Sequence, residues 1–428
     1  MSKNMRIPLG LIAALLALPA AAFADCDAFE VPGGPGATGS TLVVVGTVAK
    51  QTLILNVSAA SATVNLDCNG NNSFSDPGDF NGVAFGGDIR VFDIRLGGND
   101  VVTYNIAGDL NGNSKSAQII LGPGTNTVNV TSTATLIEGN SRVLVDIAGS
   151  SGADTVTGSI PTTIDASAFL LRVDLGAGND KVAVAFTNSV IQNGSIVGVE
   201  ALLGLGANTF QWTKTGPLVA STMSIDVEGG AGPDTVTTFL GSALSAGARY
   251  FVNADLGGGN DVFNGLLDFN TFSLTGSSEA HFRALGGLGN DILSVTRNGT
   301  VGNVLHQGGI FDVDLVGGAG NDSLTVDVAG NSYNPSANAL LRLRADGGVG
   351  NDALAVRVDA QAASVPVFDA SVTGGAGNDN VSVTLNDNGA NTTANYKPAG
   401  AVLVDGGTGI DVCPLSGNGL LHKRNCES

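Results

Sequence analysis

The stretch GGAGNDSLTV, Gly317–Val326, ends one alternating segment with two glycines, inserts an Asn-Asp pair and starts a second alternating segment at once. Glycine adopts positive φ without steric cost, and Asn and Asp favour turns because their side chains bond nearby backbone groups. Small or polar residues then alternate with apolar ones after Asp322, which is typical of a strand with one buried face. The stretch therefore predicts a strand, a tight turn and a second strand.

Copies of this turn recur along most of the chain. Close copies are GGVGNDALAV from Gly347 and GGAGNDNVSV from Gly374. The turn aspartates are Asp100, Asp154, Asp180, Asp234, Asp261, Asp291, Asp322, Asp352, Asp379 and Asp411, and two degenerate copies carry Asn126 and Asn208. About twelve copies thus lie about 26 to 32 residues apart, and a period of this size predicts a solenoid.

Residues around each turn predict how the coils stack. The second residue after the turn residue is apolar in each copy from Val102 to Val381, which predicts a buried column. Before the turn, charges mostly alternate in sign between coils, as in Asp312, Arg342 and Asp369, and opposite charges stabilise neighbouring strands. We expect an all-β, right-handed parallel β-solenoid of about twelve coils, with a third short strand in the variable segment of each coil.

The first residues predict export. Lys3 and Arg6 precede the apolar run LGLIAALLALPA, and Ala22-Phe23-Ala24 is a small-x-small cleavage pattern. The apolar run is short for a membrane span. We expect a signal peptide over 1–24, cleaved near Ala24, no transmembrane segment, and a secreted or cell-surface protein, with the periplasm as the alternative.

The four cysteines lie near the two ends of the chain. An even number in an exported chain predicts two disulfides, and three pairings are possible. We expect Cys26–Cys68 and Cys413–Cys426, each closing one end of the solenoid.

The cysteines and the repeats together predict the domain layout. We expect an N-terminal β cap region over 25–85, the solenoid over 86–412 and a C-terminal cap over 413–428. Because Pro414 lacks an N–H, we expect regular stacking to stop there. Leu420 and Leu421 would then fold back over the last coil.

Charge excludes some partners. The chain has 38 acidic against 19 basic residues and a formal net charge of −19. This charge argues against nucleic acid and anionic membranes as partners, because both repel an acidic surface. It favours cations.

The turn GGxGND followed by x-apolar-x resembles the nonapeptide of the repeats-in-toxin (RTX) family, most closely at Gly317–Leu324, Gly347–Leu354 and Gly374–Val381. In that family the turn Asp and neighbouring carbonyls bind Ca²⁺ between stacked turns. The resemblance implies calcium ligands at Asp180, Asp234, Asp261, Asp291, Asp322, Asp352, Asp379 and Asp411, and we extend this expectation to Asp100 and Asp154. The family has two such turns in each coil, whereas this chain has one, which predicts a wider coil with calcium-type turns along one edge.

Electrostatics gives an independent reason to expect a cation. Stacked turns would place carboxylates about 5 Å apart, where neighbours repel by roughly 3 kcal/mol at an effective dielectric near 20. Calcium, a hard cation that prefers oxygen ligands, would remove this repulsion. Alternatively, each Asp accepts backbone N–H bonds and caps its own turn, and both interpretations can hold together. Asn126 and Asn208 are neutral, so we expect little or no calcium at those coils.

A second candidate calcium loop is DCNGNNSFSDPGD, Asp67–Asp79. Asp67, Asn69 and Asn71 have the D-x-N-x-N spacing of an EF-hand-like loop. The downstream Asp76 and Asp79 are out of strict register with that motif.

The sequence predicts no catalytic residue. The histidines are His281, His306 and His422, and no HExxH, GxSxG or Walker pattern occurs. We therefore expect a secreted calcium-binding solenoid with a structural or adhesive role, whose further partners are surface polysaccharides or matrix proteins. The alternative is a polysaccharide-acting β-helix enzyme, a lyase, epimerase or hydrolase with its site on an outward face.

Overall fold

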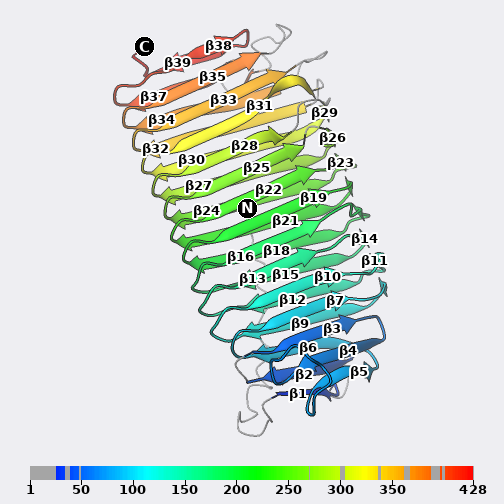
Figure 1. Ribbon diagram of the computed structural model, residues 1–428. Helices are drawn as coiled ribbons and strands as arrows, with labels where there is room; N and C mark the ends of the chain where they lie inside the picture. Colours follow the sequence, from blue (N-terminus) through cyan, green and yellow to red (C-terminus); the bar gives the residue numbers. More distant parts are fainter. Residues whose placement is uncertain are drawn as a thin grey trace.

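The computed structural model describes residues 26–33, 39–47, 50–268, 270–298, 304–335, 339–360, 367–386, 396–397 and 401–427. Within these ranges the regular structure is β-strand and no helix occurs, so there is no helix that could span a membrane. The strands stack as parallel coils that follow the sequence from one end of the molecule to the other (Figure 1). The prediction of an all-β parallel solenoid is confirmed, and the signal peptide lies outside the described residues.

One long sheet, called sheet A, contains the strand that precedes each turn. Each of its strands from β2 onward pairs in parallel with the equivalent strand of the next coil. Its strands are β1 (Cys26–Val31), β2 (Ser40–Gly46), β6 (Ile89–Leu96), β9 (Ser114–Leu121), β12 (Arg142–Ala148), β15 (Ala168–Asp174), β18 (Ile196–Leu205), β21 (Thr222–Ala231), β24 (Arg249–Gly258), β27 (Glu279–Leu288), β30 (Gly309–Ala319), β32 (Ala339–Val349), β34 (Val367–Ala376), β36 (Tyr396–Lys397), β37 (Val402–Thr408) and β39 (Leu421–Arg424).

The opposite sheet, sheet B, contains the strand that follows each turn and a row of shorter strands. The strands of sheet B outside that row are β3 (Thr52–Val57), β4 (Ser61–Asp67), β5 (Phe80–Gly86), β7 (Val101–Ile106), β10 (Thr127–Ser132), β13 (Thr155–Ser159), β16 (Lys181–Phe186), β19 (Thr209–Thr215), β22 (Thr235–Gly241), β25 (Val262–Asp268), β28 (Ile292–Asn298), β31 (Ser323–Pro335), β33 (Ala353–Ala360), β35 (Asn380–Asn386) and the three-residue β38 (Leu415–Gly417). The shorter strands are β8 (Leu110–Asn111), β11 (Leu136–Glu138), β14 (Thr163–Asp165), β17 (Ile191–Gln192), β20 (Leu218–Val219), β23 (Ala243–Ser245), β26 (Ser273–Thr275) and β29 (Val304–Gln307). This row is the expected third strand, present among the described residues in the coils from β8 to β29.

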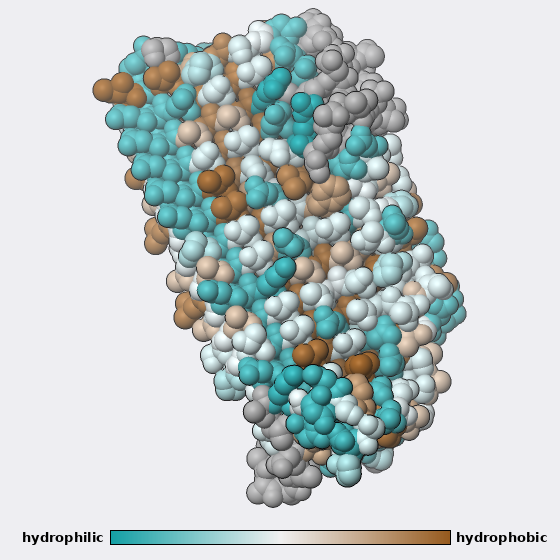
Figure 2. Space-filling model, viewed as in Figure 1, coloured by the Kyte–Doolittle hydropathy of each residue, from teal (hydrophilic) through white to brown (hydrophobic). Residues whose placement is uncertain are grey.

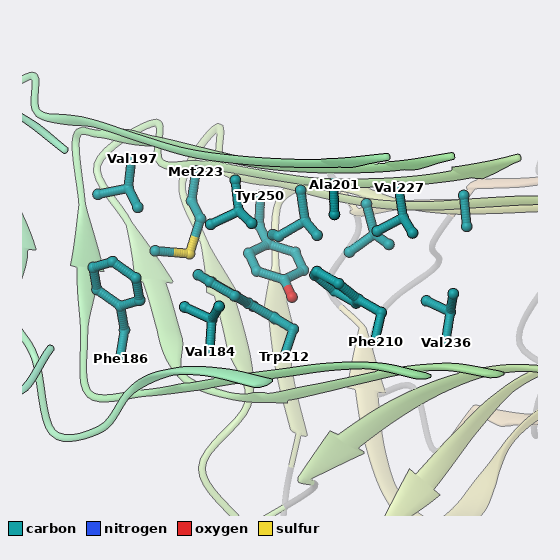
Figure 3. Packing of buried hydrophobic residues seen from close by; sticks show 14 of the residues in the cluster. Val184, Phe186, Val197, Ala201, Phe210, Trp212, Met223, Val227, Val236 and Tyr250 are labelled. Atoms are coloured by element: carbon teal, nitrogen blue, oxygen red, sulfur yellow. The ribbon is translucent and has the colours of Figure 1, made fainter. Parts of the chain in front are cut away.

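The core lies between the two sheets. The column from Val102 to Val381 stacks in register, and its members are at most 1 % exposed. Figure 3 shows side chains of both sheets meeting in this interior, where Phe186 of sheet B packs on Trp212 with ring centroids 5.3 Å apart. Met223 of sheet A reaches toward the same aromatic pair (Figure 3). The buried apolar area of these columns is the main favourable contribution to folding.

The glycines of the turn are explained by close contact between coils. Gly320 has a φ of +142°, and a Cβ on it would lie 1.6 Å from the carbonyl oxygen of Gly289 in the preceding coil. Gly318 has a φ of +114°, and its Cβ would lie 2.2 Å from Gly287 O. A side chain at either position would force the coils apart, so the third glycine of GGxG is as necessary as the second.

Antiparallel strands end the stack at the N-terminus. β1 pairs antiparallel with β2, β3 with β4, and β4 with β5. The predicted disulfide Cys26–Cys68 is confirmed and joins β1 to the loop after β4. Covering the first strands in this way protects backbone groups that would otherwise form an open sheet edge.

The C-terminal tail continues the stack, and the expectation that stacking stops at Pro414 is wrong. β38 pairs in parallel with β35, and β39 pairs with β37. A terminal strand needs ladder bonds on one side only, so the missing N–H of Pro414 is tolerated. The carbonyl oxygen of Pro414 accepts a hydrogen bond from Val383 N at 3.1 Å. Cys413 faces the core at 2 % exposure and bonds Cys426, as expected. Leu420 and Leu421 pack against the core.

A glycine exchange tests the close contact between turns. We expect Gly320→Ala to lower the free energy of unfolding by about 3 kcal/mol, because its Cβ collides with the preceding backbone. The control is Gly276→Ala, which has a φ of +67° but no atom within 4 Å of the new Cβ, and should cost about 1 kcal/mol. Denaturant unfolding measures both, and equal losses would show that contact between coils does not require the glycine.

A second exchange tests the C-terminal disulfide. We expect replacing Cys413 and Cys426 by Ser to release the tail and expose the edges of β35 and β37, so that the protein associates end to end. Light scattering measures the association, and circular dichroism checks that the body stays folded. A strictly monomeric variant would show that the disulfide does not guard this edge.

Candidate functional site

The turn aspartates form one continuous hydrogen-bonded ladder, which we call the Asp ladder. Each Oδ1 accepts the backbone N–H of the equivalent residue in the preceding coil, as Asp322 Oδ1 does from Asp291 N at 2.8 Å. The same bond, 2.7 to 2.9 Å long, repeats from Gln51 N to Asp411 Oδ1. The capping interpretation is thus extended, because each Asp caps the neighbouring coil, and Asp234 also caps its own turn by accepting Gly230 N at Oδ2 at 3.1 Å.

A second ladder runs along the same edge in the opposite direction. Where an Asn precedes the turn Asp, its side chain accepts the backbone N–H of the following coil, as Asn290 Oδ1 does from Asn321 N at 2.7 Å. The other acceptors of this Asn ladder are Asn99, Asn179, Asn260, Asn321, Asn351 and Asn378. These asparagines are exposed, and Figure 2 shows a hydrophilic band along this edge of the later coils. In the coils that have it, the Asn-Asp pair therefore bonds the turn to both neighbouring coils.

The Asp ladder ends at residues that the repeats do not reveal. Asp100 Oδ1 accepts from Gln51 N, before the first turn copy. At the other end Asp411 N donates to Glu427 Oε2, which takes the place of a turn Asp. Both ends lie in the cap segments, so the ladder spans the described solenoid.

The second carboxylate oxygen is the unusual feature of these turns. Oδ2 is buried and finds no hydrogen-bond donor among the described residues at Asp100, Asp154, Asp180, Asp261, Asp291, Asp322, Asp352, Asp379 and Asp411. Burial raises the pKa of Asp322 to about 6, although the bond from Asp291 N opposes the shift and the charges of Asp291 and Asp352 add to it. Burial likewise raises the pKa of Asp100, Asp180 and Asp261 to about 6. An ionised carboxylate here is costly unless a proton or a cation reaches Oδ2.

Oxygen atoms that suit calcium face the same space. A Cβ on Gly317 would lie 2.4 Å from Asp322 Oδ2 and 2.5 Å from the carbonyl oxygen of Gly347 in the next coil. The arrangement repeats at Gly286, Gly347 and Gly374. Calcium takes six to eight oxygens, and this space presents two of them in each of these four coils. Among the described residues no three acidic, His or Cys side chains converge as a metal cluster, and calcium at the turns stays a prediction.

The two Asn coils show what a neutral residue does at this position. Asn126 Oδ1 accepts from Asp100 N at 2.9 Å, so the ladder continues. Its Nδ2 donates to Gly122 O at 3.1 Å and to Asp154 Oδ1 at 2.8 Å. A protonated Asp has the same shape and one donor, so Asn126 and Asn208 show that the ladder accepts a neutral side chain.

The loop from Asp67 to Asp79 is closed by its own hydrogen bonds. Asp67 is fully buried and accepts the backbone N–H of Asn69, Gly70 and Asn72. The side-chain amides of Asn69 and Asn71 both donate to Asp76 Oδ2, and these bonds lower the pKa of Asp76. The three predicted ligands Asp67, Asn69 and Asn71 thus share one loop, where calcium stays a prediction.

The outward charges of sheet A stack as predicted. Asp146, Arg172 and Glu200 are register partners, and Arg172 lies 3.9 Å from Asp146 and 3.3 Å from Glu200. Further along, His281, Asp312, Arg342 and Asp369 form a second bonded row. His281 also stacks on Phe251, so its place in this row is confirmed.

The pKa values of the turn carboxyls set the expected pH dependence of stability. The folded pKa, about 6, exceeds the unfolded value of 3.8, so the folded state binds more protons between these values. Without calcium, we expect stability to fall as pH rises from about 4 through 6, and to be highest at the acid end. Thermal melts in a chelator measure this, and calcium should restore stability at pH 8 if it occupies the turns.

Two variants at one position separate the ladder from the charge. Asp322→Asn keeps the acceptor for Asp291 N, so at pH 8 in chelator it should melt higher than the parent and show a smaller calcium effect. Asp322→Ala removes the acceptor and should melt at a lower temperature, because the free energy of unfolding falls by roughly 1 to 3 kcal/mol. Lower melting of the Asn variant with the calcium effect unchanged would contradict both the raised pKa and the calcium prediction.

Comparison with known proteins assigns no family. No protein-family model, no curated protein and no solved structure matches the chain. The likeness to RTX repeats therefore rests on the turn residues alone.

Proposed function

We propose that this chain is an extracellular β-solenoid rod with a structural or adhesive role. The observation that carries the proposal is the Asp ladder, which joins each coil to the next from Gln51 to Glu427. A rod with bonds repeated at each coil and with both ends closed is a discrete, stiff spacer.

The chemistry of the two ends supports a location outside the cytoplasm. Both disulfides join cysteines that hold terminal strands in place, and such bonds persist in oxidising compartments. The predicted leader over 1–24 agrees with this location.

Calcium is part of the proposal as the cation that neutralises the turns. Outside cells calcium is plentiful enough for weak sites, and extracellular modules bind it at about 10⁻⁴ to 10⁻³ M. Binding at Oδ2 would make the rod stiff in the medium and weaker wherever calcium is low. Protonation of Oδ2 is the competing explanation for how the turn carboxylates are neutralised.

A polysaccharide-acting enzyme is the second candidate. One observation favours it, the pair of carboxylates Asp146 and Glu200 on either side of Arg172 on an outward face. Paired carboxylates are the groups that glycoside hydrolysis needs.

Binding and turnover experiments separate the two functions. We expect the mature chain to be retained on extracellular matrix isolated from cells and to release no new reducing ends from it. The control is the same chain after unfolding by heat, with the loss of structure checked by circular dichroism. Complete recovery in the unbound fraction would contradict the adhesive role. Release of reducing ends that Glu200→Gln abolishes would establish the enzyme.

A further inference from the structure

A shallow hollow of about 230 Å³ lies on the outer face of sheet A, across the strands β9 to β18. It is smaller than the roughly 300 Å³ at which pockets for drug-sized molecules begin, so it suits one small unit of a larger ligand. The side chains that line it and face outward are Gln118, Asp146, Ala148, Arg172, Asp174, Glu200 and Leu202.

One small residue, Ala148, leaves room for the hollow at this place. Ala148 lies two residues after Asp146 on β12. Its register partner in the next coil is Asp174, and the equivalent residue in the coil after that is Leu202. The short side chain leaves space beside the charged row, and Leu202 forms an apolar wall on the other side. The lining therefore has apolar carbon next to charged groups.

One charged group in the hollow, Asp146, lacks a hydrogen-bond partner for one of its oxygens. Asp146 Oδ1 is buried, and its nearest ion-pair atom, Arg172 Nη1, is 3.9 Å away, too far for a hydrogen bond. Among the described residues no donor bonds this oxygen. Burial raises the pKa of Asp146, and the charge of Glu200 adds to the shift while that of Arg172 opposes it. A ligand that donates a hydrogen bond to Asp146 would remove this cost.

The arrangement of charges decides the class of ligand. A bare metal ion is disfavoured, because the guanidinium of Arg172 occupies the space between the carboxylates of Asp146 and Glu200. An acidic sugar is disfavoured, because three carboxylates, including the exposed Asp174, face it against one Arg. Hydroxyl groups satisfy both partners, since they donate to carboxylates and accept from Arg.

We propose that this hollow binds one neutral sugar ring of a surface polysaccharide. The hydroxyls of the ring bond Asp146, Arg172 and Glu200, and its C–H face lies on Ala148 and Leu202. This site deepens the adhesive role proposed above and rests on it. Because the hollow opens on the outer face of a long sheet, the rest of the polymer can continue along the rod.

Titration with defined oligosaccharides tests the site. The probes are cellohexaose and chitohexaose, both neutral, with trigalacturonate as the acidic comparison, measured by calorimetry on the mature chain. We expect at least one neutral probe to bind and the acidic one to bind at least about tenfold more weakly. Ala148→Phe fills the hollow, and Arg172→Gln removes the shared donor, so each should weaken binding at least about tenfold.

Matched variants keep the result interpretable. Arg283→Gln removes an arginine from the same outward row, where it pairs with Asp314 outside the hollow, and should bind like the parent. Circular dichroism confirms that each variant is folded. The site would be overturned if neither neutral probe binds, if trigalacturonate binds more tightly than both neutral probes, or if Ala148→Phe leaves binding unchanged. Retention on isolated matrix, measured with the same variants, separates the outcomes: retention without oligosaccharide binding overturns the hollow but keeps the adhesive role.

Discussion

The hydrogen bond from the backbone of one turn to the carboxylate of the next is the interaction on which the solenoid depends. At a turn the regular ladder between strands is interrupted, and backbone N–H groups would be buried without partners. Asp322 Oδ1 supplies the acceptor for Asp291 N, while the backbone carbonyl of Asp291 accepts from Ser323 N at 2.8 Å. The adjacent Asn bonds in the other direction. Copying the turn thus copies a hydrogen-bonded connection between neighbouring coils.

That connector imposes a constraint on charge. Using Oδ1 as an acceptor fixes Oδ2 in a buried space over a glycine, where an ionised carboxylate lacks a donor. The chain relieves the constraint in two coils by using Asn126 and Asn208. The remaining coils keep Asp, whose raised pKa makes a proton or a calcium ion the natural companion. The acidic row is therefore a feature of coil stacking first, and a candidate metal site because of it.

Much of the fold could be predicted from the sequence because each coil repeats the same side-chain periodicity. The column from Val102 to Val381 and the alternating charges of Asp312, Arg342 and Asp369 identified both the buried face and the register. The direction of the Asp bond could not be predicted, because it depends on the offset between neighbouring turns. Lys214 was also not predicted: it takes a core position, and its Nζ donates to three backbone carbonyls, while burial lowers its pKa to about 7. The hollow beside Ala148 arises from four coils together, so no single segment predicts it.

Amide hydrogen exchange at the turns tests the ladder most directly. In Asp322→Ala, we expect the amide of Asp291, in the preceding coil, to lose protection, while the amide of Asn351 in the following coil stays protected by Asn321. In Asn321→Ala, the loss should move to Asn351, because that ladder runs the other way. Protection lost on the same side in both variants, or lost at neither amide, would contradict two opposed ladders that join the coils.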